Sequence, residues 1–343
     1  MQKKVEGENM TAAKPLDRAF VWRRMHSLFG LWIVIFLMEH LLTNSQAALL
    51  IGENGEGFIR AVNFIKNLPY LHVIEIVLLG VPILMHMIWG IRIMMSAKGN
   101  SSGSNGSKPA LKYGRNRAYS WQRITSWVLL LGIIAHVGYM RFYLYPKDVE
   151  FGTKDAYFVR LNMDPGLYTV ADRLEVKLYN QKAIDLFKDQ VETHEEHMER
   201  TLEHGERVQR SDDRSYHYTE NVAQIMSQFQ NMEDRTAYLD GLEYRSIEPG
   251  QVIAETSSFG TATLLTVRDS FKSPLKCVLY TIFVLAAVFH GFNGLWTFLI
   301  TWGIVIKMRS QSLAVNYCYG AMLVLLFLGL ASVWGTYFIN LKN

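Results

Sequence analysis

Residues 31–44 read LWIVIFLMEHLLTN, an apolar run with a histidine near its middle, and this arrangement recurs in the chain. Three more runs repeat it: LLGVPILMHMIWGIRIM at 78–94, WVLLLGIIAHVGYM at 127–140 and VLYTIFVLAAVFHGFNGLW at 278–296. The four histidines are His40, His86, His136 and His290. Ionisable side chains are costly in such runs and usually face a bundle interior, where they have a partner or a function.

Five apolar runs are long enough to cross a bilayer, which takes about 20 residues. We expect the spans near 28–50, 71–96, 124–145, 275–301 and 313–339. The two cysteines, Cys277 and Cys318, both lie inside these runs, so the chain offers no disulfide framework. A CxxCH sequence is also missing, which argues against a covalently attached haem. The sequence therefore predicts an all-α membrane protein with five transmembrane helices.

The distribution of charge predicts the orientation of the chain. The amino-terminal segment and the second and fourth loops are rich in Lys and Arg, so we expect them in the cytoplasm. The long segment 146–273 holds 15 Lys and Arg against 24 Asp and Glu, whereas the rest of the chain is strongly basic. We therefore expect a cytoplasmic segment 1–27, three spans within 28–145, an extracytoplasmic insertion 146–273 and two spans within 274–343.

The insertion has two kinds of sequence, which together predict an α+β unit. Residues 157–180 alternate apolar and polar side chains around a Pro-Gly pair, as two short strands joined by a turn do. Residues 184–210 are dense in helix formers with opposite charges three or four apart, as on a solvated helix. His194, His197 and His204 lie on that stretch, but HEEHM matches neither HExxH nor HxxEH, so a surface helix is the better reading than a metal site.

Imidazole is the side chain that binds haem iron from a helix, and four histidines on four helices supply two bis-histidine sites. A different pairing is suggested by spacing, because His26 and His40 are fourteen residues apart, as are His72 and His86. Two helices with such pairs would hold two stacked haems, as in the cytochrome b of quinol:cytochrome c reductases. However, His26 and His72 lie at the mouths of their spans, and this pairing leaves His136 and His290 unexplained.

Depth in the membrane favours one histidine per helix. With the amino terminus inside, His40 and His136 both lie toward the outer face, so we expect them to hold an outer haem. His86 lies toward the cytoplasm, so we expect it to hold an inner haem. His290 lies nearer the middle of its span, and we assign it to the same haem partly because it is the histidine that remains. A buried histidine that only makes hydrogen bonds within the core would explain one such position. It explains four positions at two matching depths less well.

Other residues fit this arrangement. Arg23, His26 and Ser27 lie at the cytoplasmic edge, where the propionates of an inner haem need hydrogen-bond donors. Pro82 should kink the second span, because its ring frees the carbonyl of Leu78 from the helical ladder.

At these residues the sequence resembles a known family. The matching stretches are RRMHSLFG (23–30), FLMEHLLTN (36–44), LPYLHVIEIVLLGVPILMHMIWGI (68–91), WQRITS (121–126), AHVGYMR (135–141) and FHGFNGLWTFLITWGIVIKMRSQ (289–311). They are similar to the five-helix, two-haem cytochrome b subunit of bacterial succinate:quinone oxidoreductases. The long insertion departs from most members and resembles chlamydial-type relatives, and Glu39 stands where relatives often carry Gln.

The resemblance implies two b haems and a multi-pass subunit of the bacterial cytoplasmic (inner) membrane. It also implies that the subunit anchors an FAD flavoprotein and an iron–sulfur protein. Electrons from succinate would pass through them to the inner haem, the outer haem and then usually menaquinone. The expected partners are these two subunits, lipid and quinone, with no nucleic acid. The chain carries no flavin motif, so we expect it not to oxidise succinate alone.

Quinone reduction needs a group that gives or takes protons near the outer haem. Glu75 and His72, at the outer end of the second span, are the candidates. The competing interpretation is that Glu75 is a carboxylate at the membrane interface without a catalytic role. Three other functions remain open: a di-haem carrier of another quinone-dependent complex, a fumarate reductase working in the opposite direction, and a membrane scaffold without redox chemistry.

Overall fold

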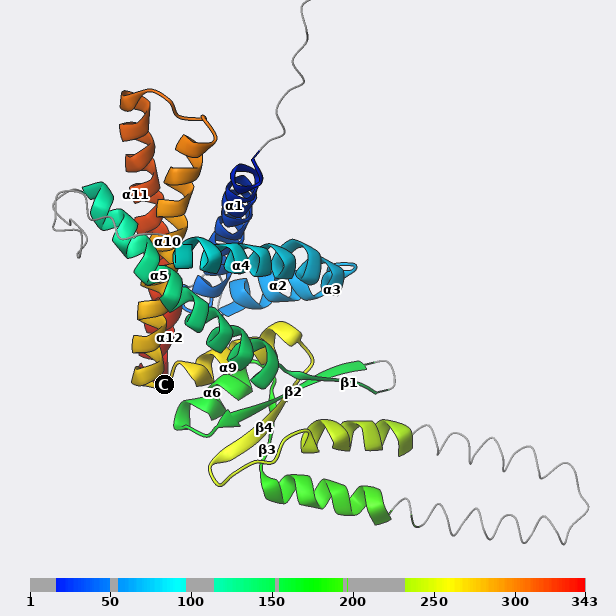
Figure 1. Cartoon of the computed structure of the whole chain (residues 1–343). Helices are drawn as coiled ribbons and strands as arrows, with labels where there is room; N and C mark the ends of the chain where they lie inside the picture. The colour runs from blue at the N-terminus through cyan, green and yellow to red at the C-terminus, as the bar shows by residue number, and fades with distance from the viewer. Residues whose placement is uncertain are drawn as a thin grey trace, which may run out of the picture.

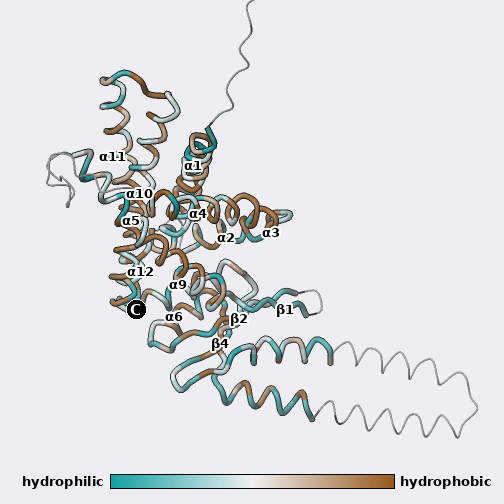
Figure 2. The backbone as a smooth tube through the Cα atoms, viewed as in Figure 1, coloured by the Kyte–Doolittle hydropathy of each residue, from teal (hydrophilic) through white to brown (hydrophobic). Residues whose placement is uncertain are grey.

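The computed structural model describes residues 17–49, 55–96, 114–151, 154–193, 196 and 232–342. Among these residues, five helical segments are long and apolar enough to cross a membrane, which confirms the five predicted spans. The segments are Arg18–Ser45, Leu71–Ser96, Asn116–Tyr143, Pro274–Thr301 and Met308–Asn340. Figure 2 shows that apolar residues follow these helices, whereas polar residues are frequent in the region below them.

The first and third spans begin earlier than their apolar runs. Helix α1 covers Arg18–Ser45, and the Asp17 side chain caps it by accepting a hydrogen bond from the backbone of Ala19. Helix α5 covers Gly114–Val137. Both helices start in basic stretches, and Arg and Gln are good helix formers that do not end a helix. Residues 18–27 are therefore the first turns of α1.

The second span is irregular at its start. It consists of α3 (Leu71–Ile74), the π-helical η2 (Glu75–Gly80) and α4 (Val81–Ser96). The indole nitrogen of Trp32 on α1 donates a hydrogen bond to the carbonyl of Leu78. Pro82 has no N–H to donate to this carbonyl. The indole of Trp32 supplies the missing hydrogen bond from α1.

Two more spans contain π-helical turns. The third span continues from α5 into η3 (Gly138–Tyr143), and the fifth runs through α11 (Met308–Leu330), η4 (Ala331–Gly335) and α12 (Thr336–Lys342). Such turns are uncommon and often accompany functional sites.

Four of the spans form a ring. Helix α1 packs against α4 and against α10 (Pro274–Thr301), and α5 packs against α10 and touches α4. Helices α1 and α5 therefore occupy opposite corners of the ring, and α4 and α10 occupy the other two. The fifth span packs on α1 and α10 from outside, with Val34, Val288, Phe292 and Leu325 in the shared core.

The loop between the first two spans contains a helix that was not predicted from the sequence, α2 (Glu56–Lys66). It packs against α9 (Phe259–Ser270), and α12 also touches α9. Phe58 of α2 is fully buried in this contact. Residues 55–70, the described part of the insertion and helix α12 thus gather at one end of the bundle (Figure 1).

The insertion contains a four-stranded antiparallel sheet with strand order β1-β2-β4-β3. The strands are β1 (Lys147–Phe151), β2 (Lys154–Asn162), β3 (Lys177–Tyr179) and β4 (Gln251–Thr256). Alternate residues of β2 point to opposite faces, as strand geometry requires. Val159 and Leu161 pack under α9 and α6, whereas Phe158 packs under the helical residues 181–193 and 232–243.

One local prediction was wrong. The Pro-Gly pair in residues 157–180 does not form a turn between two strands, because Pro165 begins helix α6 (Pro165–Arg173). Proline is favoured at the first position of a helix, where its missing N–H costs nothing. The predicted charged helix is present over 181–193. Apart from residue 196, the rest of that stretch, with His194, His197 and His204, lies outside the described residues.

Candidate functional site

The four core histidines meet in two pairs across the diagonals of the ring. His40 of α1 faces His136 of α5, with ring centroids 5.9 Å apart and ring planes at 82°. His86 of α4 faces His290 of α10, with centroids 6.3 Å apart and planes at 83°. These are the two pairs that the depth argument expects.

Both separations suit a metal ion between the rings. A metal–imidazole bond is about 2 Å long, so two imidazoles on opposite sides of one ion have centroids about 6 Å apart. The alternative pairing does not fit. His26 stacks flat on His86 with centroids 4.0 Å apart and planes at 12°, which leaves no room for an ion between them. The rings therefore fit two bis-histidine sites with one histidine from each of four helices. They do not fit the arrangement in which His26 is a ligand opposite His86.

Each of the four histidines has its Nδ1 atom next to a polar group. Nδ1 of His86 lies 3.0 Å from the backbone carbonyl of His26, and Nδ1 of His136 lies 3.0 Å from the hydroxyl of Tyr280. For His290 the neighbour is the Thr125 hydroxyl at 3.3 Å, and for His40 it is the Asn44 amide at 3.5 Å.

Within the described residues, no hydrogen bond engages Nε2 of any of the four. A histidine that binds a metal through Nε2 commonly donates its other N–H to such a neighbour, which fixes the orientation of the ring. The carbonyl, the phenol and the threonine hydroxyl can accept that N–H. Three of the four rings thus have the partner that a ligand needs.

Close packing of α1 on α4 positions His86 of the His86–His290 pair. A Cβ atom at Gly30 would lie 3.0 Å from Cε1 of His86, so a larger residue there would push the two helices apart. Gln122 of α5 donates a hydrogen bond to the carbonyl of His290 and accepts one from Asn293, which ties α5 to the ligand-bearing turn of α10.

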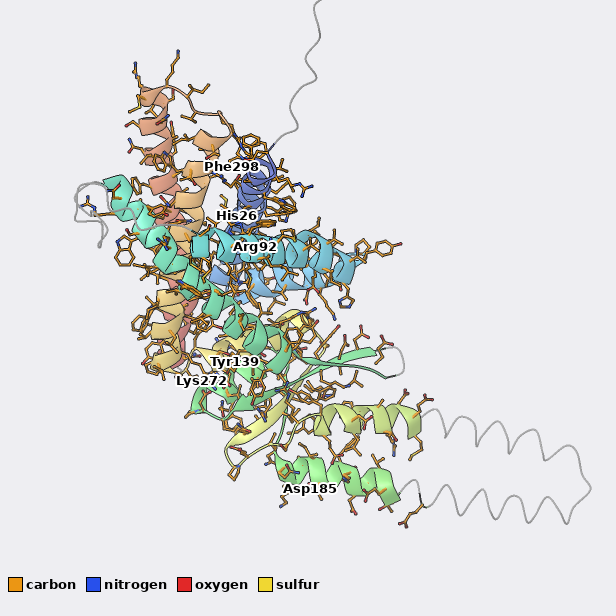
Figure 3. The ribbon with its side chains drawn as sticks, viewed as in Figure 1. His26, Arg92, Tyr139, Asp185, Lys272 and Phe298 are labelled. Atoms are coloured by element: carbon orange, nitrogen blue, oxygen red, sulfur yellow. The ribbon has the colours of Figure 1, made fainter. Side chains whose placement is uncertain are left out.

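The candidate propionate residues lie at the same end as the inner pair. The side chain of His26 is on α1 beside α4 (Figure 3), and its Nδ1 atom is buried without a hydrogen-bond partner among the described residues. Ser27 accepts a hydrogen bond from the indole of Trp302 over 2.8 Å. Arg23 is exposed. The structure therefore brings His26 and Ser27 to this end of the bundle, with one polar atom of His26 left unsatisfied.

Glu75 and His72 lie at the opposite end, beside the insertion. The Glu75 carboxylate accepts a 2.7 Å hydrogen bond from Arg141 and lies 3.6 Å from Nδ1 of His72. Glu75 begins the π-helical η2, and Arg141 lies in the π-helical η3, so this ion pair joins the two irregular turns. The His72 side chain is mostly exposed, and its neighbour Glu75 is half-buried.

Sequence reasoning missed Tyr280, Thr125 and Gly30, which orient or accommodate the histidines. Tyr280 and Thr125 are ordinary residues of apolar helices, and no spacing rule marks them. Nothing in the sequence indicated that Arg141 pairs with Glu75. Among the described residues, no group of three or more His, Cys, Asp or Glu side chains is arranged to hold a metal ion.

The fold and these pairs define a membrane-spanning helical bundle with two facing histidine pairs at different depths. The chain is 34% identical over 122 residues to the succinate dehydrogenase cytochrome b558 subunit of Bacillus subtilis (strain 168). The match covers 35% of this chain and 55% of that protein, so the chain spans about half the length of the curated relative. No protein-family model matches the chain, and no solved structure does. The chain is thus a partial homologue of a cytochrome b membrane subunit, and its five apolar helices are consistent with a membrane anchor.

Proposed function

We propose that the chain is the di-haem cytochrome b subunit of a succinate:quinone oxidoreductase, with the insertion on the extracytoplasmic side of a bacterial cytoplasmic membrane. The observation that carries the proposal is the two histidine pairs on the diagonals of the ring, 5.9 Å and 6.3 Å between ring centroids. The partial homology to a succinate dehydrogenase cytochrome b558 subunit supports it.

In this proposal His40 and His136 hold the outer haem and His86 and His290 the inner one. Bound haem supplies one-electron redox chemistry that no protein side chain here provides. The protein fixes the imidazole rings through the neighbours of their Nδ1 atoms and keeps water out by packing α11 against α1 and α10. His26, Ser27 and Arg23 remain the candidates for the inner propionates.

The cytoplasmic end would receive the flavoprotein and iron–sulfur subunits. Lys and Arg are concentrated on the amino-terminal segment and on the loops at 97–123 and 302–312, which is the bias of cytoplasmic segments. At that end α1 also exposes Phe20, Val21 and Trp22, apolar side chains of the kind that protein interfaces cover.

The outer end would reduce the quinone, which we take to be menaquinone. Glu75 is a carboxylate at a membrane end with an exposed histidine 3.6 Å away, so His72 can pass protons from water to Glu75. Arg141 holds the carboxylate in place. The same geometry also suits a structural ion pair, and the experiments below separate the two roles.

The decisive experiment is the reduced-minus-oxidised spectrum of the purified complex, with haem quantified per chain. We expect two b haems, one lost in His40→Ala or His136→Ala and the other lost in His86→Ala or His290→Ala. His72→Ala, in which the exposed histidine is removed, is the matched control and should keep both. A haem lost in His72→Ala while His136→Ala keeps both would refute the diagonal pairing.

Co-purification separates the remaining functions. A succinate:quinone oxidoreductase subunit purified from native membranes brings an FAD protein and an iron–sulfur protein with it. A di-haem carrier of another quinone-dependent complex would bring different subunits, and a scaffold without redox chemistry would show no haem spectrum. The ratio of succinate oxidation to fumarate reduction by the purified complex then gives the favoured direction.

A further inference from the structure

Three cations gather where the bundle meets the insertion, around two tyrosines of η3. Lys276, in the first turn of α10, donates a 2.6 Å hydrogen bond to the hydroxyl of Tyr139, and its Nζ atom lies 4.8 Å from the centre of that ring. Arg160 of β2 donates a 2.6 Å hydrogen bond to the hydroxyl of Tyr143. The guanidinium of Arg245 lies 4.8 Å from the centre of the same ring. Because the two tyrosine rings stack with centroids 5.7 Å apart, all three cations surround one aromatic pair.

The positive charge of this cluster is not neutralised within the described part of the chain. Lys276, Arg160 and Arg245 have no carboxylate within ion-pair distance there, whereas the nearby Lys272 pairs with both Asp164 and Asp269. All three cations are half-buried. Tyrosine rings and hydroxyls attract cations but carry no compensating charge. Partly buried cations grouped around one aromatic pair, without a carboxylate to neutralise them, favour the binding of an anion.

The surroundings of the cluster indicate an anion with an apolar portion. The cluster lies at the ends of the third and fourth spans, and Tyr139 is seen at the junction of bundle and insertion in Figure 3. Lys and Tyr at such positions face lipid headgroups. The adjoining turns of the same spans expose Phe142, Leu275 and Leu279, at 74%, 68% and 56% of their surface. A soluble anion would leave this apolar surface bare, whereas a phospholipid covers it with its acyl chains.

We propose that Lys276, Arg160 and Arg245 bind the phosphate of an anionic phospholipid, with its acyl chains against Leu275 and Leu279. Two of the cations belong to the insertion and one to the bundle, so the bound lipid joins the two parts. This role goes beyond electron transfer and requires neither haem nor quinone.

Native mass spectrometry of the purified complex, titrated separately with phosphatidylglycerol and phosphatidylcholine, tests the proposal. We expect the phosphatidylglycerol adduct to form at lower lipid concentration. Each cation removed should weaken this adduct about fivefold. Lys276→Gln should therefore lose about fivefold and Lys276→Arg should retain binding, since the charge is kept.

The triple variant Lys276→Gln/Arg160→Gln/Arg245→Gln should lose the preference for the anionic lipid. Its matched control, Arg173→Gln/Lys182→Gln/Arg235→Gln, removes the same charge from exposed positions of the insertion and should keep it. Equal retention of both lipids by the unmodified protein, or the same loss in both triple variants, would overturn the proposal. If the triple variant does not fold, the two single variants test the proposal. Equal binding of phosphatidylglycerol by Lys276→Gln and Lys276→Arg would then contradict it.

The haem spectrum of Lys276→Gln gives an independent check. The proposal expects this spectrum to be unchanged. Loss of haem in Lys276→Gln would assign the cation to haem propionates instead and would contradict the lipid site. If the proposed di-haem function were wrong, haem would already be missing from the unmodified protein. That result differs from loss of haem in Lys276→Gln alone.

Discussion

His136 of α5 and Tyr280 of α10 lie edge to face, and the phenol oxygen is 3.0 Å from Nδ1 of the imidazole. The same helix α10 carries His290 of the inner pair two to three turns further along. One helix thus supplies a candidate ligand at one depth and orients a candidate ligand at the other. The relative rotation of α5 and α10 therefore affects both histidine pairs.

Replacing Tyr280 with Phe removes the acceptor for Nδ1 of His136 and keeps the ring. A histidine that loses this bond is a weaker base and stabilises oxidised iron less. On the proposed two-haem function, we therefore expect both haems to remain bound and the midpoint potential of the haem at His40 and His136 to rise. A tenfold change in the relative stability of the two oxidation states corresponds to about 59 mV for one electron.

A spectroelectrochemical titration measures this shift. Tyr317→Phe, on the exposed surface of α11, is the matched control and should leave both potentials in place. An unchanged outer potential in Tyr280→Phe would show that the phenol does not act on the iron ligand.

The ion cluster that joins α6, α9 and the end of β2 makes a pH-dependent contribution to stability. Burial alone would raise the pKa of Asp164, but the hydrogen bonds from Arg268 and Lys272 outweigh it and hold this pKa well below its ordinary value. Because the folded-state pKa is depressed, the contribution is fully present above the pKa of the unfolded chain, about 3.9, and is lost as the pH falls toward the folded-state value.

Asp164→Asn should therefore lower the free energy of unfolding by about 3 kcal/mol at pH 7, because Arg268, only 7% exposed, would be left without its carboxylate. Asp172→Asn on the exposed side of α6 is the control, with little expected change. Denaturant unfolding at a series of pH values measures the effect. A difference between the unmodified protein and Asp164→Asn that does not shrink below about pH 4 would contradict the assignment.

The sequence predicts the spans well because apolar length alone specifies them. It also predicts which histidines meet, since orientation and depth in a membrane leave few alternatives for residues such as His40 and His136. The helix starts at Arg18 and Gly114 escaped prediction, because hydropathy marks the membrane and not the end of the helix. Charged residues such as Arg23 continue a helix outside the membrane without an apolar signal.

The contacts that refine the site depend on the rotation of the helices, which no single stretch of sequence encodes. Gly30 appears important only when His86 of another helix lies against it. Arg141 and Glu75 both lie in π-helical turns and pair with each other, and nothing in the local sequence predicts such turns. The Pro-Gly pair after Asp164 was misinterpreted because the same dipeptide suits a turn and the first turn of a helix.

Cysteine labelling tests the predicted orientation. Both native cysteines, Cys277 and Cys318, are buried, so an introduced thiol should give the dominant signal. Asp189→Cys, exposed on the insertion, should react with an impermeant maleimide in intact cells or spheroplasts. Ser312→Cys, exposed on the first turns of α11, should react only after lysis. The opposite pattern would reverse the topology and exchange the inner and outer assignments of the histidine pairs.

Glu75→Gln separates a proton-transfer role from a structural one. The amide keeps the size of the side chain and an oxygen that accepts from Arg141, but it cannot take up a proton. If Glu75 passes protons to quinone, kcat for quinone reduction should fall about 10²- to 10⁴-fold with both haem spectra intact. Arg141→Gln is the comparison, because it breaks the same ion pair and leaves the carboxylate. Equal, small losses in both variants would indicate an ion pair that only holds η2 and η3 together.

Uncoupling intact cells tests where the quinone is reduced. If succinate is oxidised inside and menaquinone is reduced at the outer end, electrons cross the membrane outward, and a negative interior favours that movement by about 2.3 kcal/mol per charge per 100 mV. Menaquinone accepts electrons from succinate poorly, so this drive matters in the oxidative direction. We therefore expect an uncoupler to lower succinate:menaquinone activity and to leave succinate oxidation by an artificial acceptor at the flavoprotein unchanged. Menaquinone activity that is insensitive to the uncoupler would place the quinone site at the inner end, and the contact of Glu75 with Arg141 would then be structural.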